Sequence, residues 1–172
     1  MRYLYIIIAI FSGLYFFAVF GLSRFLIPFM GFKKYSPPRD IPEEIKETIK
    51  ELKNRSVDQR SFLEATYNFV QERWQAERLK TISHFPLIFR TNIAEIWQRP
   101  GYAHCNTINF ILFTLLVNSR YFTEDDIRIK HIFFNMVIHQ YLRVRVGGEW
   151  LDVDPSTKYL RLPIGQHSRW FG

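Results

Sequence analysis

The sequence predicts an α+β domain preceded by one N-terminal transmembrane helix. Three observations support this class. The first is the uncharged 20-residue run Tyr3–Leu22, and the second is the nearly uncharged run Thr107–Ser119, which is too short to span a bilayer. The third is a pair of strand-like segments on either side of Gly147 and Gly148, a dipeptide typical of a tight hairpin. We therefore expect a core in which one buried helix packs on a small antiparallel sheet.

Composition and charge narrow the class of protein further. The chain has 172 residues, and because 48% of them are hydrophobic it is not a disordered polymer. A single cysteine excludes an intramolecular disulfide framework and a zinc site built on several thiolates. Residues 1–40 carry five basic residues and one acidic residue, so they hold +4 of the total net charge of +7. We interpret this basic cluster as membrane flanks and expect no nucleic-acid partner.

Residues 1–32 are expected to anchor the chain in membrane lipid. As an α-helix, Tyr3–Leu22 would be roughly 30 Å long, the thickness of a bilayer's hydrocarbon core. The run is longer than the roughly 7–15 apolar residues of a cleaved signal peptide. More basic residues follow it than precede it, so the positive-inside rule favours a single-pass protein whose domain faces the cytoplasm. The proline-rich segment 33–42 is the expected linker, and residues 43–172 form the expected domain.

Two amphipathic helices are expected at the start of the domain. Pro42 and two glutamates suit a first helical turn, and apolar residues at spacings of four and three extend a stripe to about Asn54. A second helix is expected to run to about Glu77, with either Ser56 or Asp58 as its N-cap.

The only cysteine is expected at the start of a buried helix. A short helix over Asn92–Gln98 would end ahead of Pro100 and Gly101, whose turn chemistry predicts a break. The apolar run that follows suits a central helix, which places Cys105 at or near its N-terminus. Backbone N–H groups at a helix start lower the pKa of a thiol, and they can hold the oxyanion formed when a thiolate attacks a carbonyl.

A base and a carboxylate are expected beside that thiol. The strand-like segments are Ile127–His139, Gln140–Val146 and Trp150–Val153. His139 lies eight residues before Gly147, and Asp154 lies six residues after Gly148. An antiparallel hairpin would therefore bring the imidazole and the carboxylate together at its open end. A thiol nucleophile needs such a base, and the base needs such an orienting group.

These segments together resemble the transglutaminase-like superfamily of papain-type thiol enzymes. Three stretches carry the resemblance in this order: GYAHCNTINFILFTLLVNS, HQYLRVRV and GGEWLDVDPS. The upstream stretch SFLEATYNFVQERW is similar to the aromatic-rich helix that precedes the cysteine in this family. The resemblance covers roughly residues 56–157. It implies a papain/transglutaminase-like core in which Cys105 is the nucleophile, His139 the general base and acid, and Asp154 the orienting carboxylate.

Several further residues are candidates for lesser roles. By papain-like analogy Gln98 is a candidate oxyanion donor with Tyr102 behind it, and Trp150 either packs in the core or floors a substrate cleft. Asp152 is a second candidate for the orienting carboxylate. His104 is expected to flank the site, because adjacent residues on a helix face different directions. No metal and no cofactor are expected, because the histidines lack further ligands at suitable spacing.

Acyl transfer is the function that these expectations favour. The acyl group of a peptide, an amide or a glutamine carboxamide would pass from a peptide or protein substrate to Cys105 and then to water or an amine. Hydrolysis is favoured, because nothing in the sequence marks an amine site. A second hypothesis is a catalytically silent, membrane-tethered scaffold that binds a protein. Two observations suggest it: Ala103 stands where the family often has glycine, and the segment after Asp154 is short. A third hypothesis is that the apolar N-terminus pairs with other membrane helices while the remainder assembles a complex.

Overall fold

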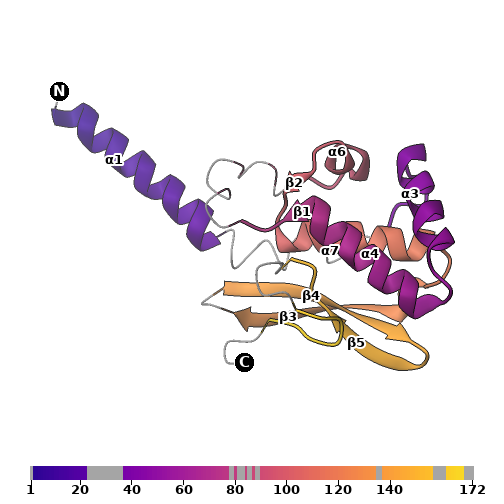
Figure 1. The fold of residues 1–172 in the computed structure, drawn as a ribbon. Helices are drawn as coiled ribbons and strands as arrows, with labels where there is room; N and C mark the ends of the chain where they lie inside the picture. The colour runs from indigo at the N-terminus through magenta and orange to yellow at the C-terminus, as the bar shows by residue number, and fades with distance from the viewer. Residues whose placement is uncertain are drawn as a thin grey trace.

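The described part of the protein is mixed α/β and contains two small sheets (Figure 1). The computed structural model describes residues 2–22, 37–77, 80, 84, 87, 90–134, 137–156 and 162–168. Its helices are α1 (Arg2–Phe16), the π-helix η1 (Phe17–Leu22), α3 (Glu43–Asn54), α4 (Gln59–Arg73), α6 (Ile93–Trp97), α7 (Cys105–Asn118) and the 3-10 helix η3 (Glu124–Asp126). Its strands are β1 (Trp74–Gln75), β2 (Gly101–Tyr102), β3 (Ile127–Phe134), β4 (Val137–Val146) and β5 (Glu149–Val153).

The larger sheet is antiparallel, with its strands in the order β3-β4-β5. Leu142 of β4 pairs with Val153 of β5, and Gly147 and Gly148 form the turn between these strands. Both glycines have positive φ, 60° and 92°, a conformation that glycine adopts without steric cost. The hairpin expected around this dipeptide is thus confirmed.

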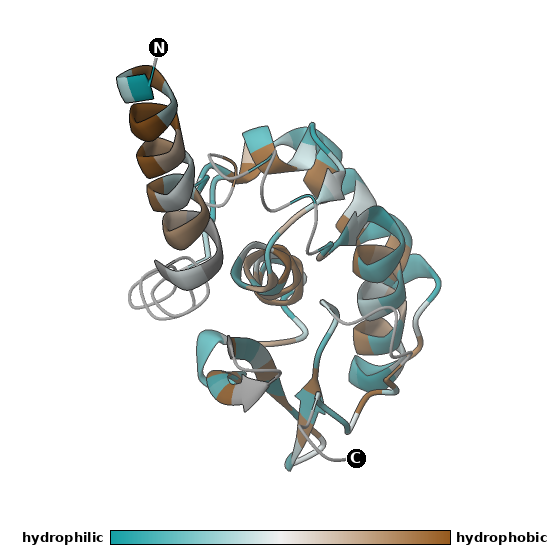
Figure 2. Ribbon diagram, turned by 90° about the vertical axis from the view of Figure 1, so that its left-hand side faces the viewer, coloured by the Kyte–Doolittle hydropathy of each residue, from teal (hydrophilic) through white to brown (hydrophobic). Residues whose placement is uncertain are grey.

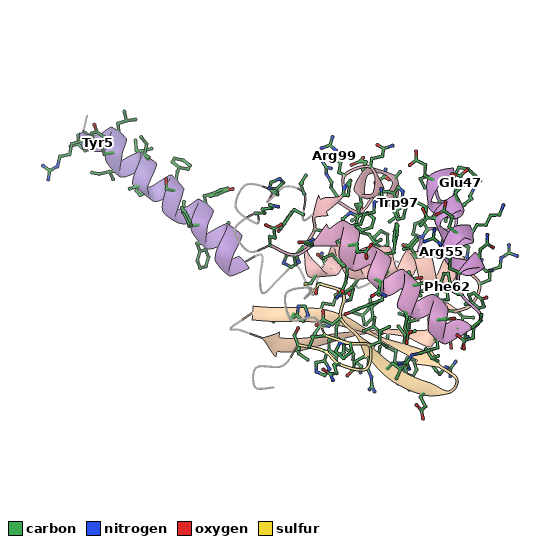
Figure 3. All side chains as sticks on the ribbon, viewed as in Figure 1. Tyr5, Glu47, Arg55, Phe62, Trp97 and Arg99 are labelled. Carbon is green, nitrogen blue, oxygen red and sulfur yellow. The ribbon has the colours of Figure 1, made fainter. Side chains whose placement is uncertain are left out.

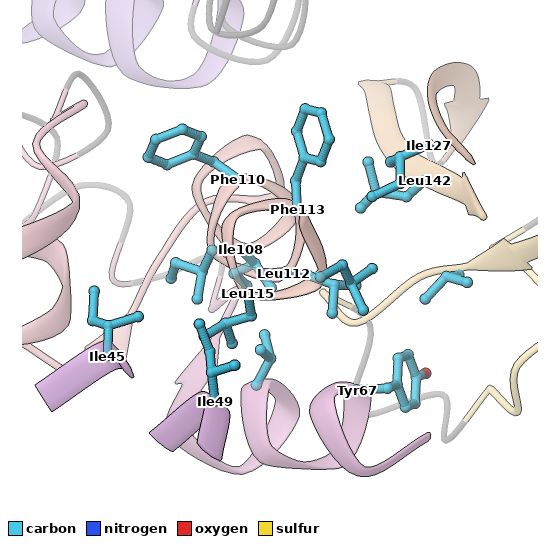
Figure 4. Packing of buried hydrophobic residues seen from close by; sticks show 14 of the residues in the cluster. Ile45, Ile49, Tyr67, Ile108, Phe110, Leu112, Phe113, Leu115, Ile127 and Leu142 are labelled. Atoms are coloured by element: carbon cyan, nitrogen blue, oxygen red, sulfur yellow. The ribbon is translucent and has the colours of Figure 1, made fainter. Parts of the chain in front are cut away.

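Helix α7 is the central element of the fold. Every residue from Cys105 to Leu116 is buried. In the view along its axis, α7 lies in the middle and the other elements surround it (Figure 2). In the core, Phe110 and Phe113 point to the side opposite Ile49 and Tyr67 (Figure 4). A helix that is apolar all round is stable in water only when it is covered in this way, so the expected buried helix is confirmed.

Helices α3 and α4 both pack against α7, and α4 lies in front of α7 in Figure 1. Local sequence signals explain why both helices form. α3 buries Ile45, Ile49 and Leu52, the apolar stripe that the sequence predicts. α4 has Asp58 as its N-cap, because the Asp58 carboxylate accepts a 2.8 Å hydrogen bond from the Ser61 backbone N–H. The alternative cap at the start of α4 is thereby resolved in favour of the aspartate.

Two element boundaries differ from the expectation. α4 ends at Arg73 rather than at Glu77, because the next two residues form β1 and pair in parallel with β2. The expected strand Ile127–His139 is two strands: β3 ends at Phe134, which pairs with the first residue of β4. Asn135 is the one residue in that stretch of sequence that favours a turn. Its apolar neighbours on both sides favour a single strand, so the break was not predicted from the sequence. His139 is therefore the third residue of β4.

Helix α1 extends away from the remaining elements (Figure 1). Its large apolar side chains, Tyr5 among them, are exposed and project from the helix on all sides (Figure 3). Among the described residues, no single helix combines the length and the apolar character needed to cross a bilayer. The spanning helix expected over Tyr3–Leu22 therefore stays a prediction. The expected linker lies within the described residues only from position 37, and residues 37–42 form neither helix nor strand.

Candidate active site

Cys105 is the first residue of α7 and is buried, with 6% of its surface exposed. The chain reaches it through Gly101, whose φ of 110° favours glycine. The Ala103 backbone N–H then donates to the Gln75 carbonyl at 3.1 Å, which fixes the approach to the helix. The thiol thus lies where the positive end of the helix dipole stabilises an anion, as the sequence predicts.

His139 and Asp154 meet at the open end of the β4–β5 hairpin. The imidazole Nε2 donates to Asp154 Oδ2 at 2.8 Å, and both side chains are buried. The last pair of the β4–β5 ladder joins Leu142 to Val153, so Asp154 lies one residue beyond the paired strands, on the side of His139. The expectation that the hairpin brings His139 and Asp154 together, based on their spacing from the Gly-Gly turn, is therefore confirmed.

Serine residues that the sequence did not single out hold the carboxylate. Ser168 donates to Asp154 Oδ2 twice, from its backbone N–H at 3.1 Å and from its hydroxyl at 2.8 Å. The Ser156 hydroxyl donates to the other oxygen, Oδ1, at 2.9 Å. Tyr67 of α4 donates to the Asp154 backbone carbonyl at 3.3 Å. Both carboxylate oxygens are thus satisfied, which a buried charge requires.

Asn109 connects α7 to β4 next to the reactive groups. It lies one helical turn beyond Cys105, and its side-chain Nδ2 donates to the Gln140 backbone carbonyl at 2.8 Å and to the Gln140 Oε1 at 3.3 Å. Asn109 and Gln140 are completely buried. Because Gln140 follows His139 in the chain, this link fixes the thiol-bearing turn of α7 beside the imidazole.

Electrostatic coupling ties the three reactive groups together. Burial alone would raise the pKa of Cys105, but His104 and a hydrogen bond with His139 outweigh burial and hold that pKa well below its usual value. Burial would lower the pKa of His139, but hydrogen bonds with Asp154 and Cys105 raise it to about 10. Although burial opposes it, the His139 imidazolium also lowers the pKa of Asp154. These three pKa shifts all favour the charged forms: a thiolate, an imidazolium and a carboxylate, buried next to one another.

His104 departs from the expectation that it only flanks the site. It is the N-cap of α7, with extended backbone angles of φ −78° and ψ 159°. Its side chain is therefore free of the helical geometry that separates neighbouring residues, and its Nδ1 lies 3.4 Å from Cys105 Sγ. His104 precedes the helix rather than lying inside it, so the expectation that it faces away from the thiol is wrong.

The remaining candidates lie in different places. Gln98 is the exposed C-cap residue of α6. Tyr102 is half-buried in β2, with its ring centroid 5.5 Å from that of His84. Trp150 lies beside the hairpin turn, where Arg128 stacks 4.2 Å above its ring. Asp154 lies four positions after Trp150, roughly 13 Å along a strand. Trp150 therefore contacts arginine side chains at the turn end of the hairpin, whereas Asp154 lies at its open end.

Asp152 is engaged away from the thiol. Its carboxylate pairs with Arg143 at 2.9 Å and with His167 Nδ1 at 2.7 Å. Asp152 thus links strand β5 to strand β4 and to the 162–168 segment. Of the two aspartates, it is Asp154 that contacts His139.

The described part of the chain offers no group of three or more histidine, cysteine, aspartate or glutamate side chains that could hold a metal ion. The site contains a thiol whose pKa is lowered by two neighbouring histidines, and a carboxylate that orients one of them, His139. This arrangement suits nucleophilic attack on a carbonyl carbon. No protein-family model, no curated protein and no solved structure matches this chain.

Proposed function

We propose that the chain is a cysteine hydrolase or acyltransferase of the transglutaminase-like, papain-type class. The observation that carries the proposal is the buried His139 imidazole, which donates to the Asp154 carboxylate at 2.8 Å and which helps to hold the pKa of the Cys105 thiol below its usual value. A buried thiol that merely packs in a core has no need of an imidazole oriented by a buried carboxylate. The proposal extends the resemblance of the three sequence segments to a transglutaminase-like domain.

The proposed reaction uses each group in turn. The Cys105 thiolate attacks the carbonyl carbon of a peptide or amide, and N–H groups at the start of α7 stabilise the oxyanion. His139 gives its proton to the leaving amine as the C–N bond breaks, which leaves a thioester on Cys105. A water molecule then loses a proton to His139 and attacks the thioester, which releases the carboxylic acid and regenerates the thiolate. Asp154 keeps the imidazole oriented in both halves.

Hydrolysis of peptide or protein amides is the favoured outcome, because no feature of the described residues marks a site for an acceptor amine. An amine in place of water would give transamidation by the same thioester.

Residues 1–32 are proposed to attach this enzyme to membrane lipid as a single-pass anchor, with the domain on the cytoplasmic side. The exposed apolar side chains of α1 support the attachment, since a surface of this kind is unfavourable in water. The basic residues that follow the run support the orientation.

The burial of the thiol favours a second candidate function. Cys105 is 6% exposed and His139 7% exposed, so a substrate must displace covering groups to reach the sulfur. A catalytically silent domain, tethered to a membrane and binding a protein partner, would need no such opening.

Alkylation of Cys105 distinguishes the two functions. The purified full-length chain is treated with iodoacetamide from about pH 5 to about pH 9, since the thiolate is the reacting form. For the enzyme, the wild type reacts well below the usual thiol pKa of about 8.5, and His139→Ala moves the reaction toward that pKa. The matched control is Arg145→Ala, which removes a half-exposed cation of the same strand that pairs with Asp126, and which leaves the profile unchanged. A thiol that reacts only above about pH 8, with no response to His139→Ala, would favour the silent scaffold.

A further inference from the structure

His104 and His139 are both within reach of the Cys105 sulfur, but their hydrogen bonds differ. His104 Nδ1 lies 3.4 Å from Cys105 Sγ and 3.0 Å from Asn106 Oδ1. His139 donates from Nε2 to the Asp154 carboxylate, and it also lowers the pKa of the thiol. The two imidazoles can therefore have different roles toward the sulfur.

The neighbouring amide fixes the proton state of His104. Asn106 Oδ1 accepts a 2.9 Å hydrogen bond from the Thr107 backbone N–H, which is always a donor. The atom that faces Thr107 must consequently be the amide oxygen rather than the amide nitrogen. Since that same oxygen faces His104 Nδ1, the ring nitrogen must carry the hydrogen. His104 Nδ1 is thus an N–H donor whether the ring is neutral or protonated, and its one hydrogen is shared between Asn106 Oδ1 at 3.0 Å and Cys105 Sγ at 3.4 Å.

We propose that His104 is a further catalytic residue, a fixed N–H donor to the Cys105 sulfur that cannot act as the base. This inference rests on the proposed function. It divides the work between two histidines: His139 takes and gives the proton, while His104 stabilises negative charge on sulfur without exchanging a proton at Nδ1.

The division affects a definite step of the reaction. Negative charge is present on sulfur before the attack, and it returns when the second tetrahedral intermediate collapses and the C–S bond breaks. At that moment His139 has just received a proton from water, and the departing thiolate accepts the hydrogen bond from His104. The electrostatics agree with this role, because the charge of Cys105 raises the pKa of His104 although burial lowers it.

Two substitutions separate a donor from a structural residue. In His104→Asn, the side-chain Nδ2 can occupy the place of the ring Nδ1 and keeps an N–H donor, whereas His104→Leu removes it. Loss of a hydrogen bond to a charged group corresponds to about a tenfold or larger loss of thiolate. We expect His104→Leu to slow iodoacetamide alkylation at about pH 6 by at least about tenfold, and His104→Asn to stay within about threefold of wild type.

A spectroscopic measurement tests the tautomer directly. Long-range ¹H–¹⁵N correlation spectra of the full chain labelled with ¹⁵N-histidine are recorded, and the His104 signals are assigned by their loss in His104→Asn. We expect a protonated Nδ1 across the titration, and we expect Asn106→Leu to release it. A neutral ring with a bare Nδ1 would overturn the inference.

The outcomes also separate this inference from the proposed function. If His104→Leu reacts like wild type while His139→Ala does not, the donor role is wrong and the thiol enzyme stands. If the wild-type thiol reacts only above about pH 8 and neither substitution matters, both are wrong.

Discussion

Replacing Asp154 by asparagine should affect stability and thiol reactivity together. The substitution keeps the shape of the side chain but removes a buried negative charge that contacts His139 and accepts three hydrogen bonds from Ser156 and Ser168. Removing one partner of a buried ion pair typically costs about 3–5 kcal/mol. We expect a loss of about 3 kcal/mol in the free energy of unfolding at neutral pH, the lower end of that range, because the single amide oxygen can still accept from one of the two serines.

The loss should depend on pH with a defined sign. The pKa of Asp154 is lowered in the folded state, so its stabilising contribution is present above the ordinary value of 3.8 and disappears as the pH falls through the folded pKa. Urea unfolding of wild type and Asp154→Asn should therefore differ most between about pH 5 and about pH 6.5. The two should converge in stronger acid, and again as the pH rises through the folded pKa of His139, which Asp154 helps to raise to about 10. In the same variant, the pKa of His139 falls and alkylation of Cys105 requires higher pH.

Asp152→Asn is the matched control. It lies two residues earlier and pairs with Arg143 and His167, but it does not contact His139. Because the arginine is 39% exposed, we expect the control to cost about 1 kcal/mol or less and to leave the alkylation profile unchanged. The reasoning would be refuted if Asp154→Asn cost no more than Asp152→Asn and left the thiol as reactive as in wild type.

Two further substitutions test the fold. Arg120 has a φ of 65°, a left-handed conformation that favours glycine. Arg120→Gly should therefore raise the free energy of unfolding by about 0.5–1 kcal/mol, whereas Arg120→Ala should give no gain. Chemical denaturation measures both variants, and equal effects would contradict the backbone explanation. Leu112 is completely buried in α7, so Leu112→Ala should lower the free energy of unfolding by about 3–5 kcal/mol. The control Val57→Ala, at a site 92% exposed, should lower it by less than about 0.5 kcal/mol. Similar losses for the two variants in thermal or urea unfolding would place Leu112 outside the core.

The relation of the three reactive residues was accessible from sequence because local rules determine it. A Gly-Gly turn sets the register of a hairpin, and the register alone brings His139 and Asp154 to the same end. The apolar run after Cys105 likewise predicts a buried helix without knowledge of its neighbours. The assignment of these residues to a transglutaminase-like enzyme stays a prediction.

The supporting contacts were not accessible in the same way. Ser168 lies in a segment with no periodic pattern, and its contact with Asp154 depends on where the chain runs after β5. The early end of α4 depends on pairing with β2, more than 25 residues later in the sequence, which overrides local helix propensity. The contact of His104 with sulfur required knowing the helix start to one residue, a precision that sequence patterns lack.

The contacts among Cys105, His139, Asp154 and Ser168 also make the reactivity of the thiol a measure of folding. These residues come from the central helix, from β4, from the end of β5 and from the segment beyond, so native pairing exists only when all of these have assembled. A partly folded chain that lacks any one of them would carry an ordinary, slowly reacting cysteine. The rate of alkylation in a refolding experiment would therefore time the last assembly step, without any added probe.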